Sequence, residues 1–186
     1  MANELRQLRD IVPIRPLTMI EALQIAERQA TKLLELAGVD AAPVPESVIS
    51  KLPRVQVERM VPSPVAGASQ WSRGRWLILV NGTDPIGRQR FTLAHELKHV
   101  IDSKFDGVPL YPAIGDLTSR ERTESVCDYF AGCLLMPRPW VKRSWREGPQ
   151  EVVALARQFE VSRQAMQVRL QQIGLIEPSK RHVFAA

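Results

Sequence analysis

The stretch Arg90-Phe-Thr-Leu-Ala-His-Glu-Leu-Lys-His99 decides how the rest of the chain is interpreted. Asp84-Pro85 precedes it as an N-cap and a first helical residue, so the sequence predicts one helix through the whole stretch. In a helix, His95 and His99 project from one face, one turn apart, and both imidazoles can bind one Zn²⁺. Glu96 borders the same face, where a carboxylate can act as the general base of a hydrolysis.

A third metal ligand is needed, because catalytic zinc keeps three protein ligands and one open position. Glu124 is the best candidate, on a second predicted helix that begins with the capping box at Thr118 and ends before Pro137. Asp128 lies four residues later on the same face, where it can accept the other ring N–H of a ligating histidine. Other candidates for the third ligand are Glu121, which the capping box explains more simply, Asp116 and His182.

Two of the three histidines of the chain stand in this motif. The residues therefore indicate a zinc metallopeptidase in which Glu96 takes a proton from water. Mn²⁺ fits the same ligands as an alternative metal. A structural or degenerate site is the other interpretation, because five-residue patterns also occur by chance.

The remaining pattern predicts an α+β fold. Residues 18–38 form a helix with a capping box at its start and glycine at its end. Three short strands then form a small, mostly antiparallel sheet packed on helices, with a hairpin turn at Arg73-Gly74. The strands are expected at 55–60, 67–71 and 75–80. Residues 1–17 lack a clear period and are expected to form an N-terminal arm.

Length and composition suit one compact domain with a small appendage. The chain has 186 residues, of which 45% are hydrophobic and 24% charged. The longest apolar run, Trp76–Val80, is too short to cross a membrane, and the start of the chain lacks the apolar region of a secretory signal. We therefore expect a cytoplasmic protein without a membrane partner. Cys127 and Cys133 lie too far apart on one helix for a disulfide and should be free thiols.

The C-terminal segment, residues 138–186, carries the whole basic excess. It has 9 Lys/Arg against 4 Asp/Glu, and the net charge of the full chain is +5. Residues 150–173 resemble a helix-turn-helix with Ser162 as the second N-cap. Its outward residues, available to DNA or to a partner, are Arg163, Gln164, Gln167 and Gln171. The alternative is that both helices pack on the peptidase core and the charges are solvated.

Two stretches resemble the ImmA/IrrE metallopeptidases, a compact zincin-like group of the gluzincin type. They are the stretch 90–99 and Glu124-Ser-Val-Cys-Asp-Tyr-Phe-Ala-Gly-Cys-Leu-Leu-Met-Pro137, and a weaker likeness extends from about residue 18 to 176. The resemblance implies a zincin-like peptidase domain at 18–137, with His95, His99 and Glu124 as zinc ligands. It also implies site-specific cleavage of a helix-turn-helix transcriptional repressor.

Two positions depart from the family pattern. Lys98 stands where the family often has glycine, and Cys127 replaces a common alanine. Lys98 lies off the ligand face of the helix, so we expect little effect from either. Tyr111, in the loop between the two ligand helices, is a candidate oxyanion stabiliser, and strand 75–80 is expected to present an edge to an extended substrate.

Two rival functions remain open at this point. One is a DNA-binding regulator whose metal site is structural or vestigial. The other is a component of a toxin–antitoxin system. Replacing Glu96 by glutamine separates the first rival from a peptidase, because only a peptidase requires that carboxylate.

Overall fold

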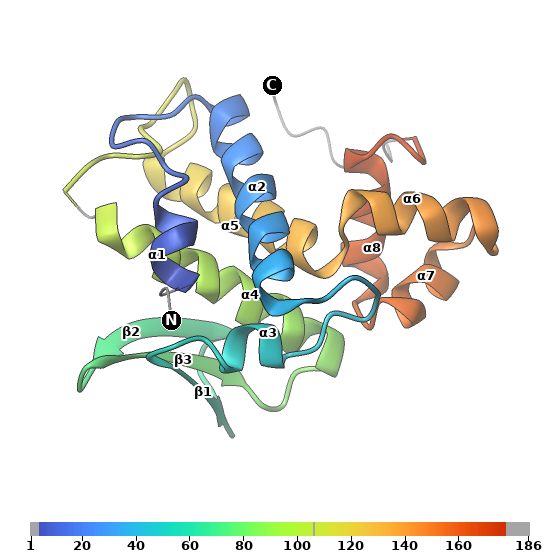
Figure 1. Cartoon of the computed structure of the whole chain (residues 1–186), viewed down its shortest axis with the longest axis horizontal. Helices are drawn as coiled ribbons and strands as arrows, with labels where there is room; N and C mark the ends of the chain where they lie inside the picture. Colours follow the sequence, from blue (N-terminus) through green and yellow to red (C-terminus); the bar gives the residue numbers. More distant parts are fainter. Residues whose placement is uncertain (1–3, 106, 178–186) are drawn as a thin grey trace.

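The two histidines lie on a helix that is held between a small sheet and a layer of further helices (Figure 1). The computed structural model describes residues 4–105 and 107–177. Its helices are α1 (Glu4–Arg9), α2 (Met19–Ala37), α3 (Ser47–Ser50), α4 (Ile86–Asp102), η1 (Ser103–Phe105), α5 (Ser119–Leu135), α6 (Arg138–Glu147), α7 (Val152–Gln158) and α8 (Arg163–Gln172). Its strands are β1 (Val55–Met60), β2 (Gly67–Ser72) and β3 (Arg75–Asn81).

The sheet is mixed, with the strand order β1-β3-β2. β2 and β3 are antiparallel and are joined by the predicted hairpin, in which Arg73 and Gly74 both have a positive φ. β1 and β3 are parallel, so the prediction of a mostly antiparallel sheet is right for one of the two pairings. The expected substrate edge on β3 is wrong, because β3 is the central strand and both of its edges are paired.

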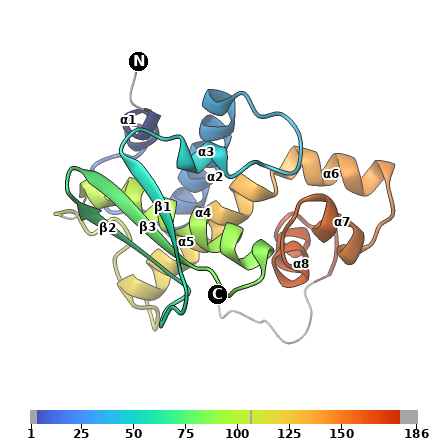
Figure 2. The ribbon, with the colours of Figure 1, turned by 90° about the horizontal axis from the view of Figure 1, so that it is seen from below.

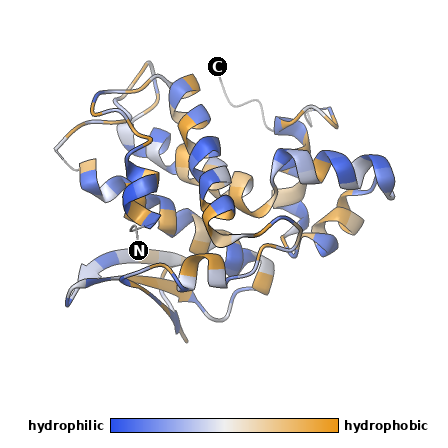
Figure 3. Ribbon diagram, viewed as in Figure 1, coloured by the Kyte–Doolittle hydropathy of each residue, from blue (hydrophilic) through white to orange (hydrophobic). Residues whose placement is uncertain are grey.

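The core lies between the sheet and α2, α4 and α5. The apolar faces of these helices turn inward (Figure 3), and Leu97, Val100 and Phe130 are fully buried. Both predicted capping boxes form, at the starts of α2 and α5. The start of α4 differs from its prediction by one residue: Pro85 is the N-cap, and the Asp84 carboxylate pairs with Arg88 at 3.4 Å instead of capping the helix.

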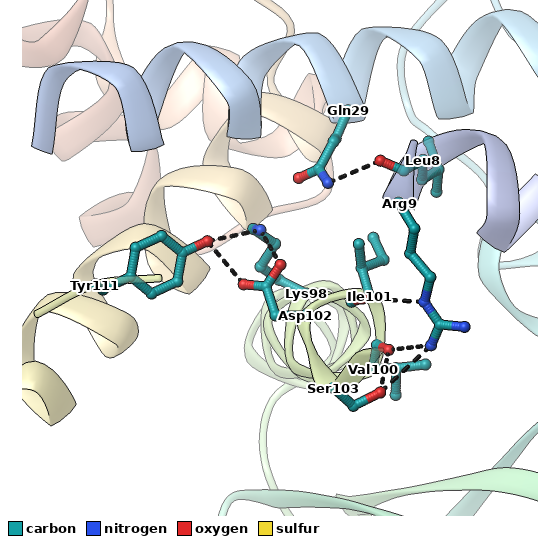
Figure 4. Close-up of polar contacts among 9 residues, drawn as sticks. All are labelled: Leu8, Arg9, Gln29, Lys98, Val100, Ile101, Asp102, Ser103 and Tyr111. Carbon is teal, nitrogen blue, oxygen red and sulfur yellow. Dashed lines mark hydrogen bonds and ion pairs between the residues drawn. The ribbon is translucent and has the colours of Figure 1, made fainter. Parts of the chain in front are cut away.

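The segment 4–17, for which the sequence predicts an N-terminal arm, contains a helix that packs on the rest of the fold. α1 packs on α2 and α4, with Leu5 and Leu8 buried. Arg9 donates from Nε to the carbonyl of Ile101 at 3.1 Å and from a terminal nitrogen to that of Val100 at 2.7 Å (Figure 4). A cation at this position satisfies unpaired carbonyls and interacts favourably with the helix dipole. The segment therefore fixes the C-terminal end of α4.

The C-terminal helices lie together on one side of the molecule, away from the sheet, in both ribbon views (Figures 1 and 2). Ser162 caps α8 as predicted, accepting a hydrogen bond from the Ala165 N–H at 3.0 Å. The turn between α7 and α8 docks on the start of α4. A Cβ added to Gly87 would lie 2.9 Å from the Ser162 nitrogen, and Arg90 pairs with Glu160 at 3.2 Å.

Several predictions about this segment stay predictions. The helix-turn-helix assignment and the boundary at residue 138 are not decided by a pair of packed helices. Residues 178–186, which include His182, lie outside the described residues.

Cys127 and Cys133 are free and buried, as expected. None of the described helices is both long and apolar enough to cross a bilayer.

Candidate metal centre

The two motif histidines lie on the rim of the core, because α4 buries its other faces. Leu93, Ala94 and Leu97 face the interior. The side chains of His95 and His99 are 16% and 29% exposed to solvent. Their Nε2 atoms are 3.2 Å apart. His95 Nδ1 lies 2.8 Å from the Asp128 carboxylate, which accepts the Nδ1–H and leaves the Nε2 lone pair directed at the point that both rings face.

Glu124 brings its carboxylate to the same point from α5. One oxygen lies 3.3 Å from His95 Nε2 and the other lies 3.8 Å from His99 Nε2. Ligand bonds of about 2.0–2.1 Å in a tetrahedral site put ligand atoms about 3.3 Å apart. The spacing of the two nitrogens and the carboxylate therefore fits the three-ligand set of a catalytic zinc site.

Cys127 is a second candidate for the third ligand. Its Sγ and one ring nitrogen of each histidine all lie within 4.8 Å of one another. Burial raises the pKa of the thiol well above its ordinary value, with nearby carboxylates adding to this and Lys98 opposing it. Metals bind the thiolate, so a buried neutral thiol competes poorly with the carboxylate of Glu124. We therefore favour Glu124 as the third ligand. Sequence reasoning did not consider Cys127 as a ligand, although its position three residues after Glu124, on the same helix face, could have indicated it.

Glu96 lies on the sheet side of the histidines and is 8% exposed. It packs against Gly67 at the start of β2: a Cβ added there would lie 3.2 Å from Glu96 Oε1 and 2.3 Å from Thr92 Cγ2. Only glycine lets the strand approach α4 this closely. Gly67 is thus a positioning residue that the sequence pattern did not single out, because its partner lies in a different element.

The charges around His95 favour its protonated form. Burial lowers the pKa of the imidazole, but the hydrogen bond to Asp128 and the negative charges of Asp128, Glu124 and Glu96 outweigh burial and raise the pKa above its ordinary value. The site therefore attracts a cation, which is either a proton or a metal ion. This agrees with the donor set of two imidazoles and one carboxylate.

Tyr111 does not face this site with a free hydroxyl. It is 5% exposed, donates to Asp102 at 2.8 Å, and accepts from Lys98 Nζ at 3.0 Å (Figure 4). Burial is the main reason why the pKa of Tyr111 is raised far above its ordinary value, and the charge of Asp102 adds to it. The hydroxyl is committed to a buried network, which argues against the expected role as an oxyanion stabiliser.

Lys98 is the centre of that network. Its side chain is fully buried, and Nζ lies 2.5 Å from Asp102. Lys98 thus lies off the ligand face but takes part in the packing of α4, and its expected small effect on the ligands stays a prediction. A buried lysine needs a paired carboxylate, which Asp102 supplies.

The remaining predicted residues lie elsewhere. The Glu121 carboxylate accepts from the Thr118 backbone N–H at 2.9 Å, which confirms its capping role. Asp116 lies in an exposed loop. Arg163 and Gln164 are exposed at the start of α8, and Gln167 and Gln171 are half-buried.

Comparison with known proteins gives three results. Residues 53–171 match the family described as the IrrE N-terminal-like domain, a peptidase family. The radiation response metalloprotease IrrE of Deinococcus radiodurans is 30% identical over 81% of the chain and 48% of its own length. A Mycobacterium tuberculosis transcriptional regulator has a similar fold, with a TM-score of 0.61 and 19% identity over 90% of the chain and 52% of its own length. The chain thus spans about half the length of each relative.

Proposed function

Since the chain belongs to the IrrE N-terminal-like family of metallopeptidases, we propose that it is a zinc-dependent endopeptidase with a narrow protein substrate. One observation carries the proposal: the Nε2 atoms of His95 and His99 and the carboxylate of Glu124 converge at separations of 3.2, 3.3 and 3.8 Å. The donor types and the spacing both suit zinc, and Glu96 lies beside them.

Each residue has a distinct part in hydrolysis. Zinc, when bound, supplies Lewis-acid activation of water and of the scissile carbonyl. Glu96 takes the proton of the attacking water on a carboxylate oxygen and delivers it to the leaving amine. Asp128 holds His95 in the tautomer that presents Nε2 to the metal. Gly67 of β2 packs closely on Thr92 and on Glu96, so the strand confines the Glu96 carboxylate from the sheet side of the site.

Among the strands, β2 is the best candidate to pair with an extended substrate, because it is an edge strand and its first residue lies beside Glu96. The Asn81 N–H donates to the Ala66 carbonyl, so the register makes Ala68, Gln70 and Ser72 the residues that bond β3. Gly67, Ser69 and Trp71 then direct their N–H and C=O groups to the outer edge of the sheet. An extended peptide can pair with this edge and so pass Glu96.

The substrate we propose is a helix-turn-helix repressor, as the family resemblance implies. The sharpest test uses Glu96→Gln, which keeps size and hydrogen bonding but removes the base. We expect the variant to bind zinc in a 1:1 ratio, as metal analysis would measure, and to lose cleavage of a repressor encoded beside the gene by at least about a hundredfold. His99→Ala serves as the contrast because it should lose both zinc and cleavage.

Two results would overturn this proposal. Full biological activity of Glu96→Gln would defeat the peptidase function and leave a regulator with a structural metal. A purified protein without stoichiometric metal after zinc loading would defeat the ligand set. Cleavage restored equally by Zn²⁺ and Mn²⁺ would leave the peptidase intact and change only its metal.

DNA binding is a second candidate function, supported by the basic surface of the C-terminal segment. Among the described residues, no ion pair occupies Arg138, Arg143 or Arg146 of α6, or Arg163 of α8. Arg169 does not contribute, because it is buried and donates to the Met136 carbonyl at 2.9 Å. A gel shift with duplex DNA that weakens steeply with salt would support this function. The absence of a shift at low salt would remove it.

A further inference from the structure

The outer edge of β2 ends in an exposed aromatic side chain. Trp71 is 51% exposed, although Gly67, Ser69 and Trp71 share the face of the sheet that turns toward α4. On β3 this face is apolar, because the partners of Gly67 and Ser69 are Val80 and Ile78, both buried. Trp71 thus continues an apolar surface beyond the point where the protein itself covers it.

Trp71 is held in place from one side. Its ring meets the ring of its cross-strand partner Trp76 edge to face, with centroids 5.4 Å apart and an interplanar angle of 63°. Trp76 in turn packs against the core. A ring that is fixed on one side and open on the other can bind a second apolar group at little cost in conformational entropy.

The position of Trp71 relative to Glu96 follows from the register. Gly67 packs on Glu96, and Trp71 lies four residues further along the same strand, about 13 Å away. Within the described part of the chain, the outward N–H and C=O groups of Gly67, Ser69 and Trp71 make no backbone hydrogen bond. A peptide paired with this edge would present alternate side chains to the α4 side, since directly opposite residues share a face.

We propose that Trp71, supported by Trp76, forms a specificity subsite for a large apolar or aromatic side chain of the substrate. The recognised residue lies about four positions from the residue that pairs opposite Gly67. This inference rests on the proposed peptidase function and adds the sequence feature that the enzyme selects. Trp71 binds substrate far from the reacting atoms, so its contribution belongs to binding and falls mainly on KM.

The test uses the zinc-loaded full chain and a mixture of randomised twelve-residue peptides, with cleavage sites mapped by mass spectrometry. The wild-type protein should enrich aromatic and large aliphatic residues at one position, three to five residues from the cut. Trp71→Ala should lose this enrichment, and Trp71→Phe should retain most of it. Gln70→Ala is the matched control, because Gln70 is exposed on the opposite face of the same strand.

A peptide pair then measures the size of the effect. For a peptide taken from the enriched set, Trp71→Ala should raise KM by about 10- to 100-fold with kcat changed little, as expected for loss of one apolar contact. For the same peptide with alanine at the recognised position, wild type and Trp71→Ala should differ by less than about twofold. Equal zinc content and equal melting temperatures show that the variants remain folded.

The failures of the two proposals are distinguishable. If the wild-type protein cleaves peptides and Trp71→Ala leaves the pattern unchanged, the subsite is refuted and the peptidase remains. If the wild-type protein cleaves no peptide and no adjacent repressor, both fall. If Trp71→Ala turns a dimer into a monomer in sedimentation without changing the cleavage pattern, Trp71 belongs to a contact between copies of the chain, which also refutes the subsite.

Discussion

Adding one methyl group at Gly67 tests the contact between β2 and the helix that carries the histidines. The new Cβ would lie 2.3 Å from Thr92 Cγ2 and 3.2 Å from Glu96 Cγ and Oε1. Carbon atoms in contact normally lie about 3.5–4.0 Å apart, so the strand and the helix must separate by about 1 Å. Overpacking of this kind costs about 1–3 kcal/mol of unfolding free energy. A displacement of about 1 Å beside the general base costs about a hundredfold in turnover.

Urea unfolding and peptide cleavage measure the two effects of Gly67→Ala separately. Gly107→Ala is the control, because a Cβ at Gly107 meets no atom within 4 Å. A second substitution, Thr92→Ser, removes the methyl group that makes the closest contact. The double variant should recover most of the lost stability, but only part of the turnover, because the contact with Glu96 at 3.2 Å persists.

If Gly67→Ala has the same stability and turnover as the wild-type protein, β2 does not pack on α4 as described. Lost stability without recovery in the double variant would place the cost in the backbone of β2 rather than in the contact with Thr92. Either outcome would also remove the argument that the outer edge of β2 passes Glu96.

Three further predictions concern other parts of the molecule. Asp128→Asn should weaken zinc binding by about 10- to 100-fold in a competition titration with a chelator, and unchanged affinity would show that Asp128 does not orient His95. Tyr111→Phe should lower the unfolding free energy by about 1–3 kcal/mol, because Asp102 loses a buried donor, while turnover per zinc-loaded molecule stays unchanged; a large loss of turnover would return Tyr111 to the site. The hydrogen bond to Arg15, followed by those to Thr18, holds the pKa of Glu21 at about 2, so this carboxylate stabilises the fold above its ordinary pKa of 4.5, and the contribution is lost as the pH falls toward 2. Melting curves of Glu21→Gln should thus lie below wild type at pH 7 and converge with it near pH 2, and a constant difference would contradict this linkage.

Features that depend on neighbours along the chain could be predicted from the sequence. The capping boxes at Thr18 and Thr118 join residues three apart, and both form. To predict that Glu124 accompanies the two histidines, it was enough to recognise two helices and to know which residues share a face on each. Their convergence at about 3 Å also needs the packing of α4 on α5, which the sequence suggested only through the family resemblance.

The order of the strands could not be predicted in the same way, because it depends on pairing between distant segments. The sequence favours a substrate edge on residues 75–80 because this strand comes shortly before the histidine motif. Its run Trp76–Val80 is continuously apolar, which is typical of a strand flanked on both sides, and this signal favoured a central position. An edge strand next to a site is expected to be less apolar, as Gly67–Ser72 is.

Lys98 and Asp102 show why the environment of the site was harder to predict than its ligands. A lysine and an aspartate four apart on a helix normally form a solvated surface pair that contributes little. Here the loop after α4 places Tyr111 over the pair, and Lys98 becomes fully buried. The same two residues then form an ion pair whose disruption would leave an uncompensated charge inside the protein. The helix that carries the two histidines is thus fixed to the loop by Lys98, one position before His99.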